Sequence, residues 1–269
     1  MSDPMMLILV SAGAGVFGGL LAGLLGVGGG IVIVPALYFA LSLTGMEPDL
    51  TIRIAVGTSL ATIIFTSLSS ARAHHKRGAI DFQILRYWAP SIAIGVVIGS
   101  LLGGFVSGQL MLGVFALTAF AVAMDMIMRN PAPREAPRQF PGAVWFSLGG
   151  AAGIVSAMMG IGGGTVCVPM LSFLGYDIRR AVGTASVIGL VIAIPGAAGY
   201  VFTGLGVPGR LPYSIGYVNL VAVVAIIPLT VTMAPLGARL AHAIPRRALR
   251  LAFGSFLLIT SLRMLWDIL

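Results

Sequence analysis

Two short glycine-rich stretches of nearly equal sequence are the best candidates for a ligand-binding site in this chain. Residues 26–35 read GVGGGIVIVP and residues 160–169 read GIGGGTVCVP. Glycine permits positive φ angles and a close approach of backbone to ligand. Successive backbone N–H groups leading into a helix N-terminus make an anion site. We call residues 26–30 and 160–164 the first and second glycine turns, and we expect helices to begin near Ile31 and Thr165.

The residues expected to donate to an anion there are Gly28, Gly29, Gly30, Gly162, Gly163, Gly164 and Thr165. Their recurrence at equivalent places in two apolar regions favours this interpretation over a single chance triplet. The alternative is close helix packing, for which glycine is common in membrane proteins.

A short segment with hydroxyl side chains follows each turn further along the chain. The segments are Gly57-Thr58-Ser59 and Gly183-Thr184-Ala185-Ser186. A hydroxyl can donate to an oxyanion without placing a charge in lipid, so Thr58, Ser59, Thr184 and Ser186 are further candidate ligands. Helical spacing also puts Ser59, Thr62, Thr66 and Ser69 on one face. Alternatively, these hydroxyls bond back to carbonyls of their own helix.

Three further residues have a weaker claim to a gating or proton-linked role. Arg72 could meet an anion at the cytoplasmic mouth, or extend to lipid headgroups. His74 could carry a proton, or be an ordinary surface histidine. Asp81 is better explained as a cap at a span end than as a proton carrier.

Several function classes are disfavoured. The chain contains a single cysteine, and no nucleophile–base triad, HExxH motif or Walker loop occurs. We therefore expect no catalytic residue, no metal site and no cofactor. Carboxylates are nearly absent from the apolar segments, which argues against a cation carrier. The net charge of +8 is better explained by membrane topology than by nucleic-acid binding.

The composition indicates that membrane-spanning helices position these residues. Of 269 residues, 58% are hydrophobic and only 9% are charged, whereas soluble domains carry about 25% charged residues. Ten apolar segments are predicted, at residues 5–26, 29–43, 51–71, 82–106, 110–128, 142–160, 163–175, 181–203, 214–241 and 248–268. We expect an all-α polytopic membrane protein with eight to ten membrane segments, in which the short second and seventh segments form helical hairpins with their predecessors at the glycine turns.

The two halves align beyond the glycine turns. Ala55–Thr58 matches Ala181–Thr184, and six further pairs, from Gly78 with Gly216 to Met126 with Met264, share one offset. The sequence thus predicts a first repeat at 1–128, a cytoplasmic linker at 129–141 and a second repeat at 142–269.

Placing the basic clusters in the cytoplasm puts thirteen of the sixteen Lys and Arg residues inside. This requires two inverted repeats of five segments, with both termini periplasmic. A parallel duplication of four spans is the rival, and it would put one basic cluster on the wrong side.

The chain resembles the TauE/SafE family of sulfite exporters, also known as the TSUP family of anion permeases. The resemblance rests on the two glycine turns with their prolines, the AVGTS and AVGTAS segments, and the HHKRGAIDF and SIGYVNL stretches. Matching positions are Gly28–Gly30, Pro35, Gly57, Thr58, His74, Gly78, Gly162–Gly164, Pro169, Gly183, Thr184 and Gly216. The second half has Asn219 where the first has Asp81. This difference argues against a role in which both halves use a carboxylate at this position.

This resemblance implies an inner-membrane carrier for small sulfur anions such as sulfite, thiosulfate or organosulfonates. We expect secondary transport in the outward direction, possible coupling to protons, and partners limited to this anion and the lipid bilayer. The sequence leaves the oligomeric state open. It also leaves two rival functions, a passive anion channel and a membrane assembly factor that transports nothing itself.

Overall fold

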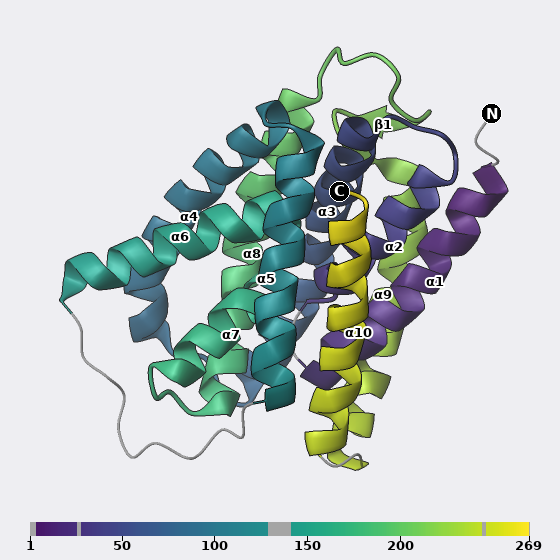
Figure 1. Cartoon of the computed structure of the whole chain (residues 1–269). Helices are drawn as coiled ribbons and strands as arrows, with labels where there is room; N and C mark the ends of the chain where they lie inside the picture. The colour runs from purple at the N-terminus through teal and green to yellow at the C-terminus, as the bar shows by residue number, and fades with distance from the viewer. Residues whose placement is uncertain (1–3, 26–27, 129–140, 244–245, 269) are drawn as a thin grey trace.

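The computed structural model describes residues 4–25, 28–128, 141–243 and 246–268, and almost all of them are helical (Figure 1). The helices of the first half are α1 (Pro4–Leu25), α2 (Gly30–Ser42), α3 (Pro48–Lys76), α4 (Phe82–Phe105) and α5 (Gly108–Met128). Those of the second half are α6 (Gly142–Met159), α7 (Gly163–Phe173), α8 (Ile178–Thr203), α9 (Leu220–Ala243) and α10 (Arg246–Trp266). The predicted all-α class is confirmed. The predicted linker at 129–141 lies outside the described residues except for Pro141, the N-cap of α6.

Six of the described helices are long and apolar enough to cross a membrane: α3, α4, α5, α6, α8 and α9. Shorter apolar helices lie at Leu7–Gly23 within α1, at α2, at α7, and at Leu251–Trp266 within α10. With 13 and 11 residues, α2 and α7 are too short to cross a hydrocarbon core of about 30 Å at ~1.5 Å per residue. The fold is therefore that of a multi-pass membrane protein, with two helices that begin inside it at the glycine turns.

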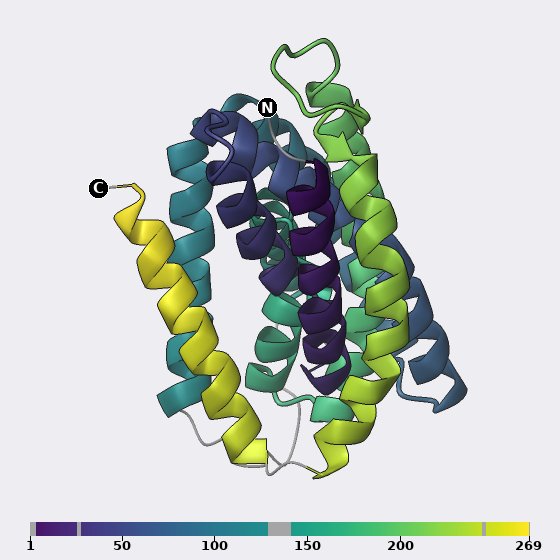
Figure 2. The same cartoon turned by 90° about the vertical axis from the view of Figure 1, so that its right-hand side faces the viewer.

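The two halves are interleaved, so that most helices of one half pack against helices of the other. Helix α1 lies along α9, as Figure 2 shows, and α4 lies along α6. In the centre α3 packs on α8, and α5 packs on α10. Within each half the short helix covers the next long one, α2 on α3 and α7 on α8. The same contacts recur when the helices of one half are exchanged for those of the other.

Glycines allow this interleaved packing. A Cβ built on Gly19 of α1 would lie 2.7 Å from the Cα of Thr230 in α9. A Cβ built on Gly99 of α4 would lie 2.8 Å from the Cα of Ile154 in α6. Since side chains do not approach backbone this closely, the two helix pairs depend on glycine for their spacing.

The ninth segment begins later than the sequence predicts. Residues 214–219 were expected to be helical, but they form an antiparallel β-hairpin of β1 (Ser214–Ile215) and β2 (Val218–Asn219) before α9 starts. Gly216 has a φ of 57°, and the Tyr217 N–H donates to the Tyr200 carbonyl rather than to a helical partner. These features end the hairpin against α8 and delay the helix.

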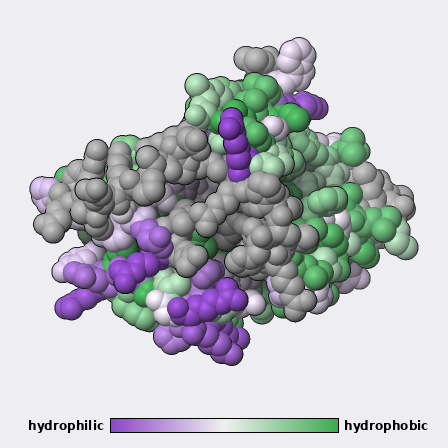
Figure 3. All heavy atoms as spheres, turned by 90° about the horizontal axis from the view of Figure 1, so that it is seen from below, coloured by the Kyte–Doolittle hydropathy of each residue, from purple (hydrophilic) through white to green (hydrophobic). Residues whose placement is uncertain are grey.

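Most of the exposed basic side chains among the described residues gather at one end of the molecule, and Arg263 lies at the other. The gathered side chains include Arg72, Lys76, Arg77, Arg180 and Arg247. Figure 3 views the molecule from this end and shows hydrophilic side chains gathered toward the lower left, with hydrophobic side chains mostly at the right. Helix α1 begins and α10 ends at the opposite end (Figures 1 and 2). The clustering agrees with the charge asymmetry expected from the sequence, and the orientation of the chain in the membrane stays a prediction.

Candidate anion site at the two glycine turns

The first glycine turn has a backbone that only glycine adopts easily. Gly28 has a φ of 74° and Gly29 a φ of 78°, and Gly29 is the N-cap of α2. Its carbonyl accepts from the N–H groups of Val32 and Ile33 at 3.0 and 3.1 Å. A Cβ on Gly29 would also lie 3.0 Å from the Gly18 carbonyl oxygen. Local conformation and close packing both require glycine here.

The second glycine turn has a different conformation. Its positive φ, 68°, falls at Gly160, the C-cap of α6, whereas Gly162 caps α7 with a φ of −77°. The matching Gly26 lies outside the described residues. The two turns thus share a sequence but not a backbone path, and both lead directly into a buried short helix.

The structure brings the two turns into contact. A Cβ built on Gly28 would lie 4.0 Å from the Cα of Gly162. A Cβ on Gly30 would lie 2.7 Å from the Gly160 carbonyl oxygen. The first N–H groups of α2 and α7, which have no partner within their own helices, are therefore gathered at one place in the protein interior. The same contacts are also those expected if the glycines serve close helix packing. The geometry is therefore compatible with both an anion site and close packing.

Thr58 and Thr184 make matching contacts across the halves. The Thr58 hydroxyl accepts from the N–H of Asn219, and the Thr184 hydroxyl accepts from the N–H of Asp81, each at 3.0 Å. Asp81 and Asn219 are themselves helix caps, since their side chains accept from N–H groups at the starts of α4 and α9. Each half thus holds the start of a long helix in the other half.

The remaining candidate hydroxyls separate into two groups. Ser59 donates to the carbonyl of Gly160 at 2.7 Å and so touches the second turn. Ser186 donates to the Gly183 carbonyl of its own helix, and Thr62 donates to the Ser59 carbonyl of α3. The Thr66 hydroxyl lies 3.2 Å from the Ile63 carbonyl of α3 and 3.4 Å from the Gly28 carbonyl in the first turn. Ser69, expected on the same face, is exposed. For Ser186 the alternative of a bond within its own helix is therefore what the structure shows.

Thr165 differs from every other candidate. It lies in the first turn of α7 and is only 1% exposed. Within the described part of the chain its hydroxyl finds no hydrogen-bond partner. Buried hydroxyls are usually paired, so an unpartnered one at this position is available to a ligand.

Arg72, His74 and Asp81 lie away from the turns. Arg72 is exposed near the end of α3, and His74 is half-buried one half-turn further on. Asp81 lies 3.9 Å from Arg180, which is itself largely exposed. Burial and the Asp81 carboxylate together raise the pKa of Tyr176, so its phenol stays protonated near neutral pH. The cap predicted for Asp81 is confirmed.

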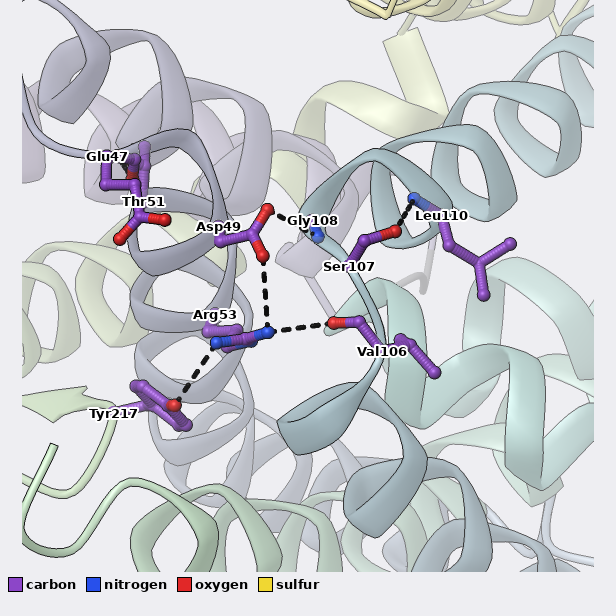
Figure 4. A network of polar contacts seen from close by, with 9 residues as sticks. All are labelled: Glu47, Asp49, Thr51, Arg53, Val106, Ser107, Gly108, Leu110 and Tyr217. Carbon is purple, nitrogen blue, oxygen red and sulfur yellow. Dashed lines mark hydrogen bonds and ion pairs between the residues drawn. The ribbon is translucent and has the colours of Figure 1, made fainter.

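A polar network at the opposite end of α3 was not singled out from the sequence (Figure 4). The guanidinium of Arg53 donates to the Val106 carbonyl at 2.8 Å, and lies 3.5 Å from both the Asp49 carboxylate and the Tyr217 hydroxyl. Asp49 also accepts from the Gly108 N–H at 2.7 Å. The four-residue spacing of Asp49 and Arg53 was the available signal, and the network ties α3 to the α4–α5 connection and the hairpin.

Comparison with known proteins shows which family this chain is similar to. The family described as "Sulfite exporter TauE/SafE" matches residues 11–264. A Haemophilus influenzae protein named "Probable membrane transporter protein" is 33% identical over 96% of this chain and 97% of its own length. A protein of the same description from Methanocaldococcus jannaschii is 29% identical over 92% of this chain and 91% of its own. No solved structure matches the chain.

Proposed function

Because the chain belongs to the TauE/SafE sulfite exporter family, a family of membrane transporters, we propose that it carries a small sulfur-containing oxyanion out of the cell across the inner membrane. Sulfite, thiosulfate and small organosulfonates are the candidate solutes. The carrier would work as a secondary transporter, with an inside-negative membrane potential favouring outward movement of the anion by about 2.3 kcal/mol per charge per 100 mV. Proton coupling, with His74 as a titratable group at the basic end, belongs to the same proposal.

The observation that carries the proposal is the meeting of the two glycine turns. Two helix N-termini, α2 and α7, begin at this contact, and the unpartnered hydroxyl of Thr165 lies in the first turn of α7. Backbone N–H groups and a hydroxyl can hold a negative solute without a buried cationic side chain. Ser59 reaches the second turn from α3, through its bond to the Gly160 carbonyl.

Alternating access follows from the interleaved halves. We propose that the halves are inverted repeats, as the exchangeable packing of α1–α5 and α6–α10 supports. Thr58 then meets Asn219 on the outer side of the turns, and Thr184 meets Asp81 on the inner side. Breaking the first contact would open the site outward, and breaking the second would open it inward.

Transport by the purified protein tests the proposal. Proteoliposomes are loaded with radiolabelled sulfite, and efflux is measured against protein-free liposomes with and without unlabelled sulfite outside. A carrier gives saturable efflux that external sulfite accelerates by exchange. Fast efflux that rises linearly with concentration would indicate a channel, and efflux no faster than from protein-free liposomes, for each candidate anion, would indicate a protein that transports none of them.

A further inference from the structure

A surface groove between α3 and α9 combines basic and apolar chemistry away from the glycine turns. The cavity measures about 470 Å³ and lies at the basic end of α3. Arg72 and Lys76, one helical turn apart, provide its charge, and Ser69 adds a hydroxyl. Both basic side chains are exposed. The groove can therefore bind an anionic group at the end of α3, at the level where this helix leaves the membrane.

The deeper wall of this groove is apolar. Phe65 and Leu68 line it from α3, and Ile227 and Val231 line it from α9. Phe65 is 49% exposed, so its ring is open to the hydrocarbon that surrounds this apolar helix. From Arg72 to Phe65 the wall descends about 10 Å along the helix. A ligand that matches the whole groove needs a negative head and a hydrocarbon tail.

The matched positions in the second half carry no such chemistry. Continuing the alignment of Ala55–Thr58 with Ala181–Thr184 pairs Ser69 with Pro195, Arg72 with Ala198, and Lys76 with Phe202. A group that acts on the transported solute from both sides of the membrane would be expected in both halves. The charges occur at one end alone, which fits a component of one leaflet better than the solute.

The geometry points to a binding site for one anionic phospholipid in the α3–α9 groove, with the phosphate at Arg72, Lys76 and Ser69 and an acyl chain along Phe65 and Val231. The site belongs to the leaflet on the basic side of the protein. It does not depend on which solute the chain transports, so it can be tested even if the proposed function fails.

Native mass spectrometry of the purified protein with phosphatidylglycerol tests the site, with phosphatidylcholine as the neutral lipid and inorganic phosphate as the free anion. The wild-type protein should retain one phosphatidylglycerol more tightly than phosphatidylcholine. The double variant Arg72→Ala/Lys76→Ala should weaken this binding about 30-fold, since each basic residue near an anionic surface contributes about fivefold. Lys76 and Arg72 can also be replaced by Gln, should the alanine variant not fold.

The matched control is Arg86→Ala/Arg247→Ala, which also removes two exposed positive charges and should bind phosphatidylglycerol as the wild type does. Equal losses in both double variants would mean diffuse surface charge and overturn the site. Equal retention of phosphatidylcholine, or displacement of the lipid by inorganic phosphate at similar concentration, would overturn it as well.

Discussion

The hydroxyl of Thr58 in the first half accepts a hydrogen bond from the backbone N–H of Asn219 in the second, at 3.0 Å, although the residues are 161 positions apart. Thr184 makes the matching contact with Asp81. Both N–H groups belong to residues that cap a long helix. The two contacts therefore join the halves directly, and a motion of one half relative to the other would have to break or shift them.

Replacing Thr58 by Val should lower the free energy of unfolding by about 1–3 kcal/mol, because the N–H of Asn219, a residue only 1% exposed, loses its acceptor. Unfolding in mixed detergent micelles measures this. Thr62→Val is the matched control, since Thr62 is equally buried in the same helix but bonds only to its own helix carbonyl. Equal losses in both variants would contradict a special role for the contact between halves.

Asp81 should tolerate Asn but not Ala. Its side chain caps α4, and Asn caps helices about as well as Asp, as Asn219 does for α9. We expect Asp81→Asn to keep both stability and transport, and Asp81→Ala to cost about 1 kcal/mol. Transport at two pH values checks this, because loss of pH-dependent transport in Asp81→Asn alone would reassign the carboxylate to proton transfer.

The inverted arrangement predicts that matched loops face opposite sides of the membrane. The only native cysteine, Cys167, is fully buried and should not react with membrane-impermeant thiol reagents. In intact cells, His75→Cys should be protected and Leu205→Cys should be labelled. Both positions are exposed and lie at the ends of corresponding helices, His75 in the last turn of α3 and Leu205 just after α8. Labelling of both from the same side would refute the inverted repeats.

Much of the fold could be predicted from the sequence because its determinants are local. Apolar segment length located α4 and α5 to within a few residues, and the repeated glycines located the starts of α2 and α7. The cap at Asp81 follows from a polar residue placed just before an apolar run. These features depend on neighbours in the chain.

The partners of the buried polar groups could not be predicted, because they come from distant segments. Nothing near Thr58 indicates that Asn219 is its donor, and nothing near Arg53 indicates the Val106 carbonyl. The β-hairpin before α9 was missed because SIGYVNL is apolar enough to read as part of a span. Which hydroxyls stay unpartnered, Thr165 above all, emerges only once every other donor and acceptor has been placed.

Thr165→Val gives the sharpest separation of folding from binding. Since the hydroxyl has no partner among the described residues, its removal should leave stability unchanged or slightly raised. If the hydroxyl helps to hold the anion, affinity should fall about tenfold, as expected for loss of one hydrogen bond to a charged group of about 1.5 kcal/mol. Ser11→Ala is the control, because it removes another unpartnered buried hydroxyl from α1, well before the first glycine turn.

Calorimetric titration of sulfite, thiosulfate and a small sulfonate into the wild-type protein, Thr165→Val and Ser11→Ala is the most direct test of an anion held between the glycine turns. The account predicts that at least one anion binds to the wild type and to Ser11→Ala with equal affinity, and about tenfold more weakly to Thr165→Val. Undiminished binding to a folded Thr165→Val protein would contradict the assigned role of its hydroxyl, and absence of binding to the wild type would contradict the site itself.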